Sequence, residues 1–130
     1  MRALIAVLLA LIIGACATPA GYYPSDDPNF IELDEIPGRA SDLHGQRIRT
    51  YGLVLMNERS RNLVSKRGID GQICIRLLVT AEELKRLRTY DGKWLVVEGR
   101  FDKEGCGGNT ICHDSCGPYT ISDPVLSSPR

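Results

Sequence analysis

Residues 44–55 read HGQRIRTYGLVL and residues 91–101 read DGKWLVVEGRF. In each segment a glycine precedes a run in which apolar residues partly alternate with polar ones, and a second glycine lies inside that run. Alternation with a period of two is typical of a half-buried strand, and a glycine within a strand favours a bulge or a sharp bend. The two segments therefore predict long strands over 46–56 and 93–101, with the first bent at Gly52.

The rest of residues 43–126 predicts three shorter strands and one helix. Strands are expected over 63–65 and 119–125, and alternating apolar residues predict another over 73–79. Residues Thr80 to Glu83 have the form of a capping box, which marks the start of a helix, and leucines follow at helical spacing. The helix should end after about two turns, near Tyr90. The predicted order is strand, strand, strand, helix, strand, strand.

This order resembles the oligonucleotide/oligosaccharide-binding (OB) fold. The resemblance covers residues 43–126 and implies an all-β domain with one short helix, built as a small five-stranded Greek-key barrel. Another small β-barrel or a sandwich remains the alternative. Side chains fill a barrel of this size, so Trp94 and most apolar strand residues are expected in the core.

The first 16 residues have the pattern of an export signal. Arg2 precedes the apolar run from Ala3 to Ile13, which is about 11 residues long and too short to span a bilayer as a helix. The run leads into Ile13-Gly14-Ala15-Cys16, which resembles the lipobox of bacterial lipoproteins, although the family more often has leucine at the position of Ile13. An ordinary secretory signal followed by an unrelated cysteine is the alternative.

The lipobox resemblance implies where the chain is located. Residues 1–15 would be removed as the signal peptide. Cys16 would then carry a diacylglycerol, usually with a further acyl chain such as palmitate on the new amine. Ala17 after the cysteine implies sorting to the outer membrane of a Gram-negative bacterium, with the domain most simply facing the periplasm. The membrane is thus an expected partner, through the lipid anchor.

Residues 16–42 are expected to form a tether between the lipid and the domain. Residues 17–42 contain four prolines and have a net charge of −5. As a flexible coil such a segment reaches roughly 25–30 Å, which would let the domain stand clear of the membrane. An apolar cluster between Phe30 and Ile36 should nevertheless dock on the edge of the domain. Residues 127–130 are expected to be a short tail.

Length and charge exclude several classes of protein. Removal of residues 1–15 leaves 115 of the 130 residues, which is enough for a single domain but excludes large enzyme architectures. The chain balances 16 basic against 16 acidic residues, and residues 43–126 have a net charge of only +3. This is below the basic footprint of a dedicated nucleic-acid binder, so no nucleic-acid partner is expected.

Four cysteines remain beside Cys16, and an oxidising periplasm favours two disulfides with three possible pairings. The OB resemblance places the third and fifth strands side by side and parallel. It therefore implies a bridge from Cys74 to Cys116, which leaves Cys106 with Cys112. A bridge from Cys74 to Cys112 fits almost as well, and either would fasten residues 105–118 to the barrel.

The alternative to two disulfides is a metal site or a metal- or thiol-dependent enzyme built on the Cys106 to Cys116 loop. Cys106, Cys112, His113 and Cys116 can hold zinc, but their spacing lacks the paired short-spaced ligands of structural zinc sites. No Cys-x-x-Cys occurs, which excludes covalent haem attachment and a thioredoxin-like site. His44 and His113 are the only histidines of the chain. The sequence contains neither a Gly-x-Ser-x-Gly elbow nor a phosphate-binding loop. No catalytic residue, metal or cofactor is therefore assigned.

One basic cluster is a candidate ligand site. It lies at the turn between the first two strands and on the return strand, a rim that OB-like barrels commonly use for ligands. The cluster consists of Arg59, Arg61, Lys66 and Arg67. We expect a membrane-anchored, periplasmic, non-enzymatic binding or scaffold module, whose rim contacts an envelope protein or an envelope polyanion.

Overall fold

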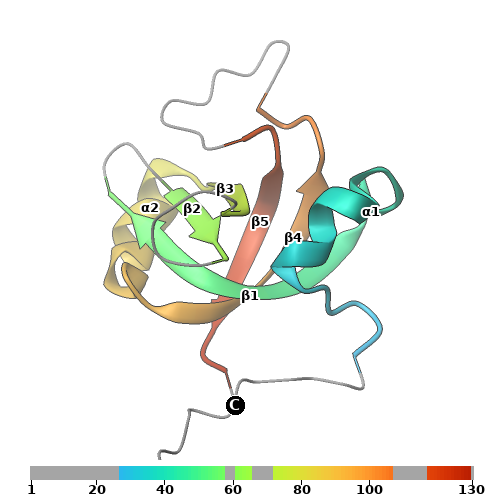
Figure 1. The fold of residues 1–130 in the computed structure, drawn as a ribbon. Coiled ribbons are helices and arrows are strands. Elements are labelled where there is room, and N and C mark those ends of the chain that lie inside the picture. Colours follow the sequence, from blue (N-terminus) through green and yellow to red (C-terminus); the bar gives the residue numbers. More distant parts are fainter. Residues whose placement is uncertain (1–26, 58–60, 66–71, 107–116, 130) are drawn as a thin grey trace, which may run out of the picture.

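A closed barrel of five strands forms the body of the protein (Figure 1). The structure is a computed structural model and describes residues 27–57, 61–65, 72–106 and 117–129. The strands are β1 (Arg47–Met56), β2 (Arg61–Val64), β3 (Cys74–Leu78), β4 (Trp94–Asp102) and β5 (Thr120–Ser127). They neighbour one another in the order β1-β2-β3-β5-β4, with β4 closing onto β1. The barrel confirms the predicted OB-like fold class.

β3 and β5 pair in parallel, and all other neighbouring strands of the barrel pair in antiparallel fashion. Leu77 of β3 pairs with Ile121 of β5, and Phe101 of β4 pairs with the same isoleucine from the other side. β5 therefore lies between two strands that precede it in the chain. The side-by-side arrangement of the third and fifth strands, which the sequence analysis assumed for Cys74, is present.

β1 changes partners next to Gly52, the position at which the sequence analysis expected a bend. It pairs with β4 from Arg47 to Leu53 and with β2 from Leu53 to Met56. A Cβ on Gly52 would lie 2.7 Å from Cδ1 of Leu33 and 2.9 Å from the Val64 carbonyl oxygen. The backbone at Gly52 is thus too close to its neighbours for a side chain. The pairing with β4 runs through Gly52 without a shift, which excludes a bulge in this pair.

The interior of the barrel is filled by apolar side chains that alternate along the strands. On β4 the inward residues are Leu95, Val97 and Phe101, each no more than 2% exposed. Trp94 has the opposite parity and is 38% exposed. The expectation that Trp94 belongs to the core is therefore wrong, because strand parity places it on the outer surface.

The predicted helix is present between β3 and β4. It consists of α2 (Ala81–Leu87), which continues as the 3-10 turn η2 (Arg88–Tyr90). The Glu83 backbone N–H donates to the Thr80 hydroxyl at 3.2 Å, and the Thr80 N–H donates to the Glu83 carboxylate at 2.8 Å. These bonds lower the pKa of Glu83. The capping box is confirmed, and Leu84 and Leu87 are buried against the barrel.

Residues before β1 also belong to the packed domain. The 3-10 turn η1 (Leu33–Glu35) and helix α1 (Ile36–Leu43), which were not predicted, place Leu33 and Ile36 in the core. Asn29 and Ile31 form backbone hydrogen bonds of 2.9 and 2.8 Å with Arg49, so this segment runs alongside β1. The expected docking of the apolar cluster is confirmed, but the packed part begins before residue 43, the predicted start of the domain.

Candidate functional site

The predicted basic rim lies mostly outside the described residues. Arg59, Lys66 and Arg67 are outside them, while Arg61 is at the start of β2. The Arg61 side chain is half-buried, and its Nε has no hydrogen-bond partner among the residues that the structure describes. The rim therefore stays a prediction.

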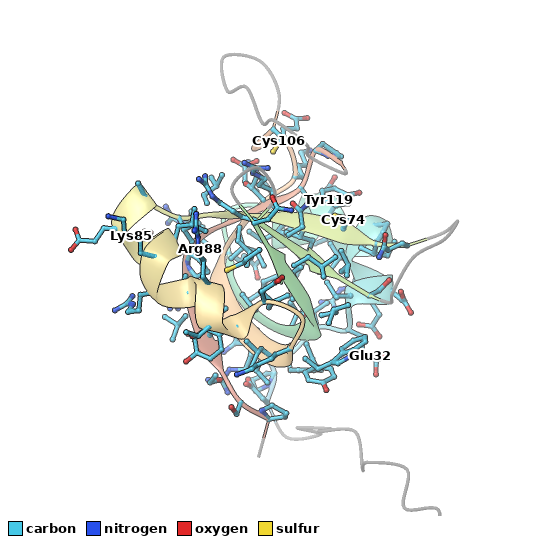
Figure 2. All side chains as sticks on the ribbon, turned by 90° about the vertical axis from the view of Figure 1, so that its left-hand side faces the viewer. Glu32, Cys74, Lys85, Arg88, Cys106 and Tyr119 are labelled. Atoms are coloured by element: carbon cyan, nitrogen blue, oxygen red, sulfur yellow. The ribbon has the colours of Figure 1, made fainter. Side chains whose placement is uncertain are left out.

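Two of the four cysteines are described, and both are disulfide-bonded. Cys74 at the start of β3 is 7% exposed and packs with Leu53 and Val64 on the outer side of the strands. The backbone N–H of Cys106, which follows β4, donates to the Pro118 carbonyl at 3.0 Å. Cys74 and Cys106 lie toward the same end of the barrel (Figure 2).

The pairing of the cysteines stays a prediction. Cys112, Cys116 and His113 lie outside the described residues. As a disulfide, Cys106 offers no thiolate for zinc or for nucleophilic chemistry. Within the described ranges, no group of three or more His, Cys, Asp or Glu side chains is placed to hold a metal ion, and no helix is long and apolar enough to cross a bilayer.

An ion-pair network on the outer face of β1 and β4 holds the N-terminal segment in place. Arg47 Nε donates to Glu98 at 2.7 Å, and Arg49 donates to Glu98 at 2.9 Å through Nη2. Through Nη1, Arg49 also donates to Asp27 at 2.8 Å. Arg49 therefore links the first described residue to the barrel. The hydrogen bonds from Arg47 and then Arg49 lower the pKa of the Glu98 carboxyl.

Replacing Glu98 with glutamine is expected to cost about 1 kcal/mol of stability at pH 7, because the two arginines lose their shared partner. The folded-state pKa of Glu98 is depressed, so its contribution is complete above the unfolded pKa of about 4.3 and is lost as the pH falls through the folded value. Urea unfolding at pH 7 and at pH 2 measures this. The variant and the parent should differ at pH 7 and converge in acid.

The matched control is Glu104→Gln, which removes an exposed carboxylate that lies outside the helices and has no ion-pair or hydrogen-bond partner among the described residues. Its stability at pH 7 should equal that of the parent. A deficit for Glu98→Gln that stays constant across the pH range would show that the network is not the cause.

A half-open hollow of about 440 Å³ lies over the outer side of β3, β5 and β4. Its lining includes Leu78, His44, Arg100, Asp102 and Ser122. His44 Nδ1 is 3.4 Å from the Asp102 carboxylate. The side chain of Arg100 forms no ion pair or hydrogen bond within the described part of the chain. The volume suits a small ligand, and the lining offers charges of both signs, a hydroxyl and an apolar side chain. The sequence analysis assigned no role to His44 and did not predict this hollow.

An aromatic pair is exposed where β4 begins. The rings of Tyr51 and Trp94 have centroids 5.5 Å apart and are tilted by 30°. The neighbouring Lys93 places its Nζ 5.8 Å from the centre of the Tyr90 ring. The flat faces of such side chains can stack on planar or apolar groups, and their polar atoms stay in water.

Four cations lie within residues 85–93, directly before β4 in the chain. They are Lys85 and Arg86 of α2, Arg88 of η2, and Lys93, and all four side chains are exposed. We call these four residues the basic corner. The sequence analysis counted them only in the domain total. The exposed face of the predicted helix, which has three of the four within four positions, was the signal that could have identified the cluster.

Comparison with known proteins gives a distant likeness to a solved structure. No protein-family model matches the chain, and no curated protein matches it. Among solved structures, it is similar to the structure of RecG bound to a three-way DNA junction, with a TM-score of 0.48 and 17% sequence identity. The similarity covers 78% of this chain and 12% of the RecG chain.

This finding corrects the exclusion of nucleic acid as a partner. The structure to which the chain is similar is a protein bound to DNA, so the exclusion is withdrawn. Its physical basis was also weak, because it used a net charge averaged over residues 43–126. The cations of the basic corner are concentrated at one place, and a local charge density governs contact with a polyanion more directly than a domain total.

Proposed function

We propose that this chain is an exported, lipid-anchored binding module of the bacterial envelope, held at the membrane through Cys16. The observation that carries the proposal is the disulfide bonding of Cys74 and Cys106. Disulfides form and persist in oxidising compartments such as the periplasm and are rare in the cytosol. This agrees with the apolar run and the lipobox-like residues Ile13 to Cys16.

The barrel supports a binding role on its outer surface. Its interior is occupied by side chains such as Val54, Leu63 and Phe101, so a ligand must contact the outside. The hollow beside Arg100 and Asp102 is one such place, and the surface around Trp94 is another. A scaffold or binding module needs no more than a rigid barrel with such surfaces on it.

The first test is the intact mass of the protein purified from its native membrane, measured with and without reduction before alkylation. We expect the mass of a chain that begins at Cys16 and carries lipid. Without reduction the cysteines should take up no alkyl groups, and after reduction they should take up four. The Cys16→Ala variant is the matched control and should lose the lipid while keeping the disulfides.

Two results would overturn the proposal. A mass without lipid in the parent protein would remove the anchor. Free thiols at Cys106, Cys112 and Cys116, or metal found by elemental analysis, would favour the alternative of a metal- or thiol-dependent enzyme that uses this loop. Density-gradient fractionation and protease treatment of intact cells test the outer-membrane location and the periplasmic orientation.

A further inference from the structure

We propose that the half-open hollow over the outer side of β3, β5 and β4 binds a free α-amino acid with an aliphatic side chain. The inference rests on the proposed function and names the ligand class of that binding module. Three features of the lining carry it: an arginine without a partner among the described residues, carboxylates that do not pair with this arginine, and an exposed leucine.

The strand register places an apolar and a cationic side chain at opposite ends of one row across the hollow. Leu78 of β3 pairs with Ser122 of β5, and Ser122 pairs with Arg100 of β4 on its other side. All three residues line the hollow. Neighbouring strands are about 4.8 Å apart, so the row is roughly 10 Å long. A small ligand can therefore contact both ends of the row, with the Ser122 hydroxyl between them.

Arg100 is available to a carboxylate of a ligand. Its side chain is exposed and forms no ion pair or hydrogen bond with the residues that the structure describes. Arg47, which lies opposite Arg100 on β1, is neutralised by Glu98 at 2.7 Å. A guanidinium presents its donors in a planar fork that matches a carboxylate. An arginine in this situation favours a ligand that has a carboxylate.

Two carboxylates of the lining can accept an ammonium group. Asp102 follows Arg100 by two positions on β4, so both project from the same face of the strand at a spacing of roughly 6.5 Å. Asp102 Oδ1 accepts the Glu104 backbone N–H at 2.8 Å and lies 3.4 Å from His44 Nδ1. The second oxygen of Asp102 and the exposed Glu104 carboxylate have no partner among the described residues. They leave acceptors free beside the cation.

The charges of the lining favour a zwitterion. One arginine opposes two carboxylates, so the lining has a net charge of −1 when its histidine is neutral. A simple anion would meet both carboxylates, and a simple cation would meet Arg100. An α-amino acid carries its ammonium and its carboxylate on one carbon atom, so Asp102 and Arg100 can contact both groups at once.

The leucine at the far end of the row selects the side chain of the ligand. Leu78 is 37% exposed, and an amino acid whose carboxylate lies at Arg100 can extend an aliphatic side chain towards it. Contact between the two removes apolar surface from water, which favours binding. We therefore expect leucine to bind more tightly than glycine.

An irregular stretch of β5 borders the hollow. Asp123 directly follows Ser122 and has a φ of 49°, in the left-handed region that residues other than glycine rarely adopt. The register of β5 against β4 shifts at the same place. Bulges and strained residues of this kind are found preferentially at binding sites, where they direct side chains. Their position next to a lining residue agrees with a binding role for the hollow.

The test is a titration of the isotope-labelled, lipidated protein in detergent micelles, followed by NMR at pH 7. With leucine we expect saturable shifts of the backbone N–H signals of Leu78, Asp102 and Ser122. The Kd should be about 1 mM, which is ordinary for so small a ligand. Glycine should bind about tenfold more weakly. N-acetyl-leucine lacks the ammonium and leucine amide lacks the carboxylate, so each should also bind about tenfold more weakly.

Variants assign the binding to the hollow. Arg100→Gln and Asp102→Asn should each weaken leucine binding about tenfold, because each removes one charge-assisted contact. Arg88→Gln is the matched control, since it removes a positive charge from an exposed position on η2 that does not line the hollow. It should bind leucine as the parent does. Well-dispersed N–H signals should show that all variants are folded.

Three outcomes would overturn the inference. The first is the absence of saturable shifts with leucine. The second is equal binding of leucine and either of its blocked forms, which would assign the hollow to one end of a peptide. The third is an effect of Arg88→Gln equal to that of Arg100→Gln. Failure of the proposed function looks different, because Cys16 then carries no lipid while the protein still binds leucine.

Discussion

Replacing Gly99 with alanine is expected to destabilise the barrel by about 3 kcal/mol, because the new methyl group has no space. It would collide with Cγ2 of Ile121 and lie 2.6 Å from the carbonyl oxygen of Ser122. The oxygen belongs to the backbone of β5 and cannot rotate away. The position also coincides with the register shift between Glu98 and Arg100 in the pairing of β4 with β5. Urea unfolding followed by Trp94 fluorescence measures the loss.

Gly38→Ala is the matched control for this prediction. Gly38 lies inside α1, and a Cβ there would meet nothing within 4 Å. Alanine is the better helix former, so this variant should gain about 0.5–1 kcal/mol. If the free energy of unfolding falls for Gly99→Ala and rises for Gly38→Ala, the loss arises from the packing of β4 on β5 and not from alanine as such. Equal unfolding midpoints for the two variants would contradict the account.

Ile36→Ala is expected to cost about 3 kcal/mol, because it removes a fully buried side chain from the core. Ile36 is 0% exposed and belongs to α1, in the segment that the sequence analysis assigned to the tether. The same unfolding experiment measures it. Val125→Ala is the control, since Val125 is 56% exposed, and its variant should stay within about 0.5 kcal/mol of the parent.

A cost below 1 kcal/mol for Ile36→Ala would mean that α1 is not part of the cooperative unit. The connection between the proposed lipid anchor and the barrel would then lengthen to the predicted tether. A large cost would show that α1 unfolds together with the barrel. The fold itself would then fix the point at which the connection to the proposed anchor begins.

The strands and α2 could be predicted because their signals are local. The alternation in residues 93–101 and the reciprocal bonds of Thr80 and Glu83 depend only on neighbours in the chain. Gly52 was informative for the same reason, since a glycine inside an apolar strand indicates an unusual backbone. The bounds of β1, β3 and β4 differ from the predictions by one residue at most ends.

Features that depend on distant parts of the chain were missed. Glu98 meets Arg47 and Arg49 across 51 and 49 positions, and nothing in the sequence pairs them. α1 has Pro37 and Gly38 in eight residues, so its helical conformation depends on the burial of Ile36. Trp94 was placed in the core because side chains fill a barrel of this size, although the parity of Leu95 and Val97 already indicated the outer surface.

The parallel pairing of β3 with β5 determines how early in folding the barrel can close. β5 is the last strand of the barrel, yet it supplies partners to both β3 and β4, so the sheet stays open until Thr120–Ser127 has joined it. Pairing between segments so far apart in the chain is slow, since loop-closure entropy opposes it before any contact compensates. A chain that crosses a membrane in the unfolded state benefits from this delay. If this chain is exported as proposed, its topology postpones barrel closure until nearly all of the domain has emerged on the far side.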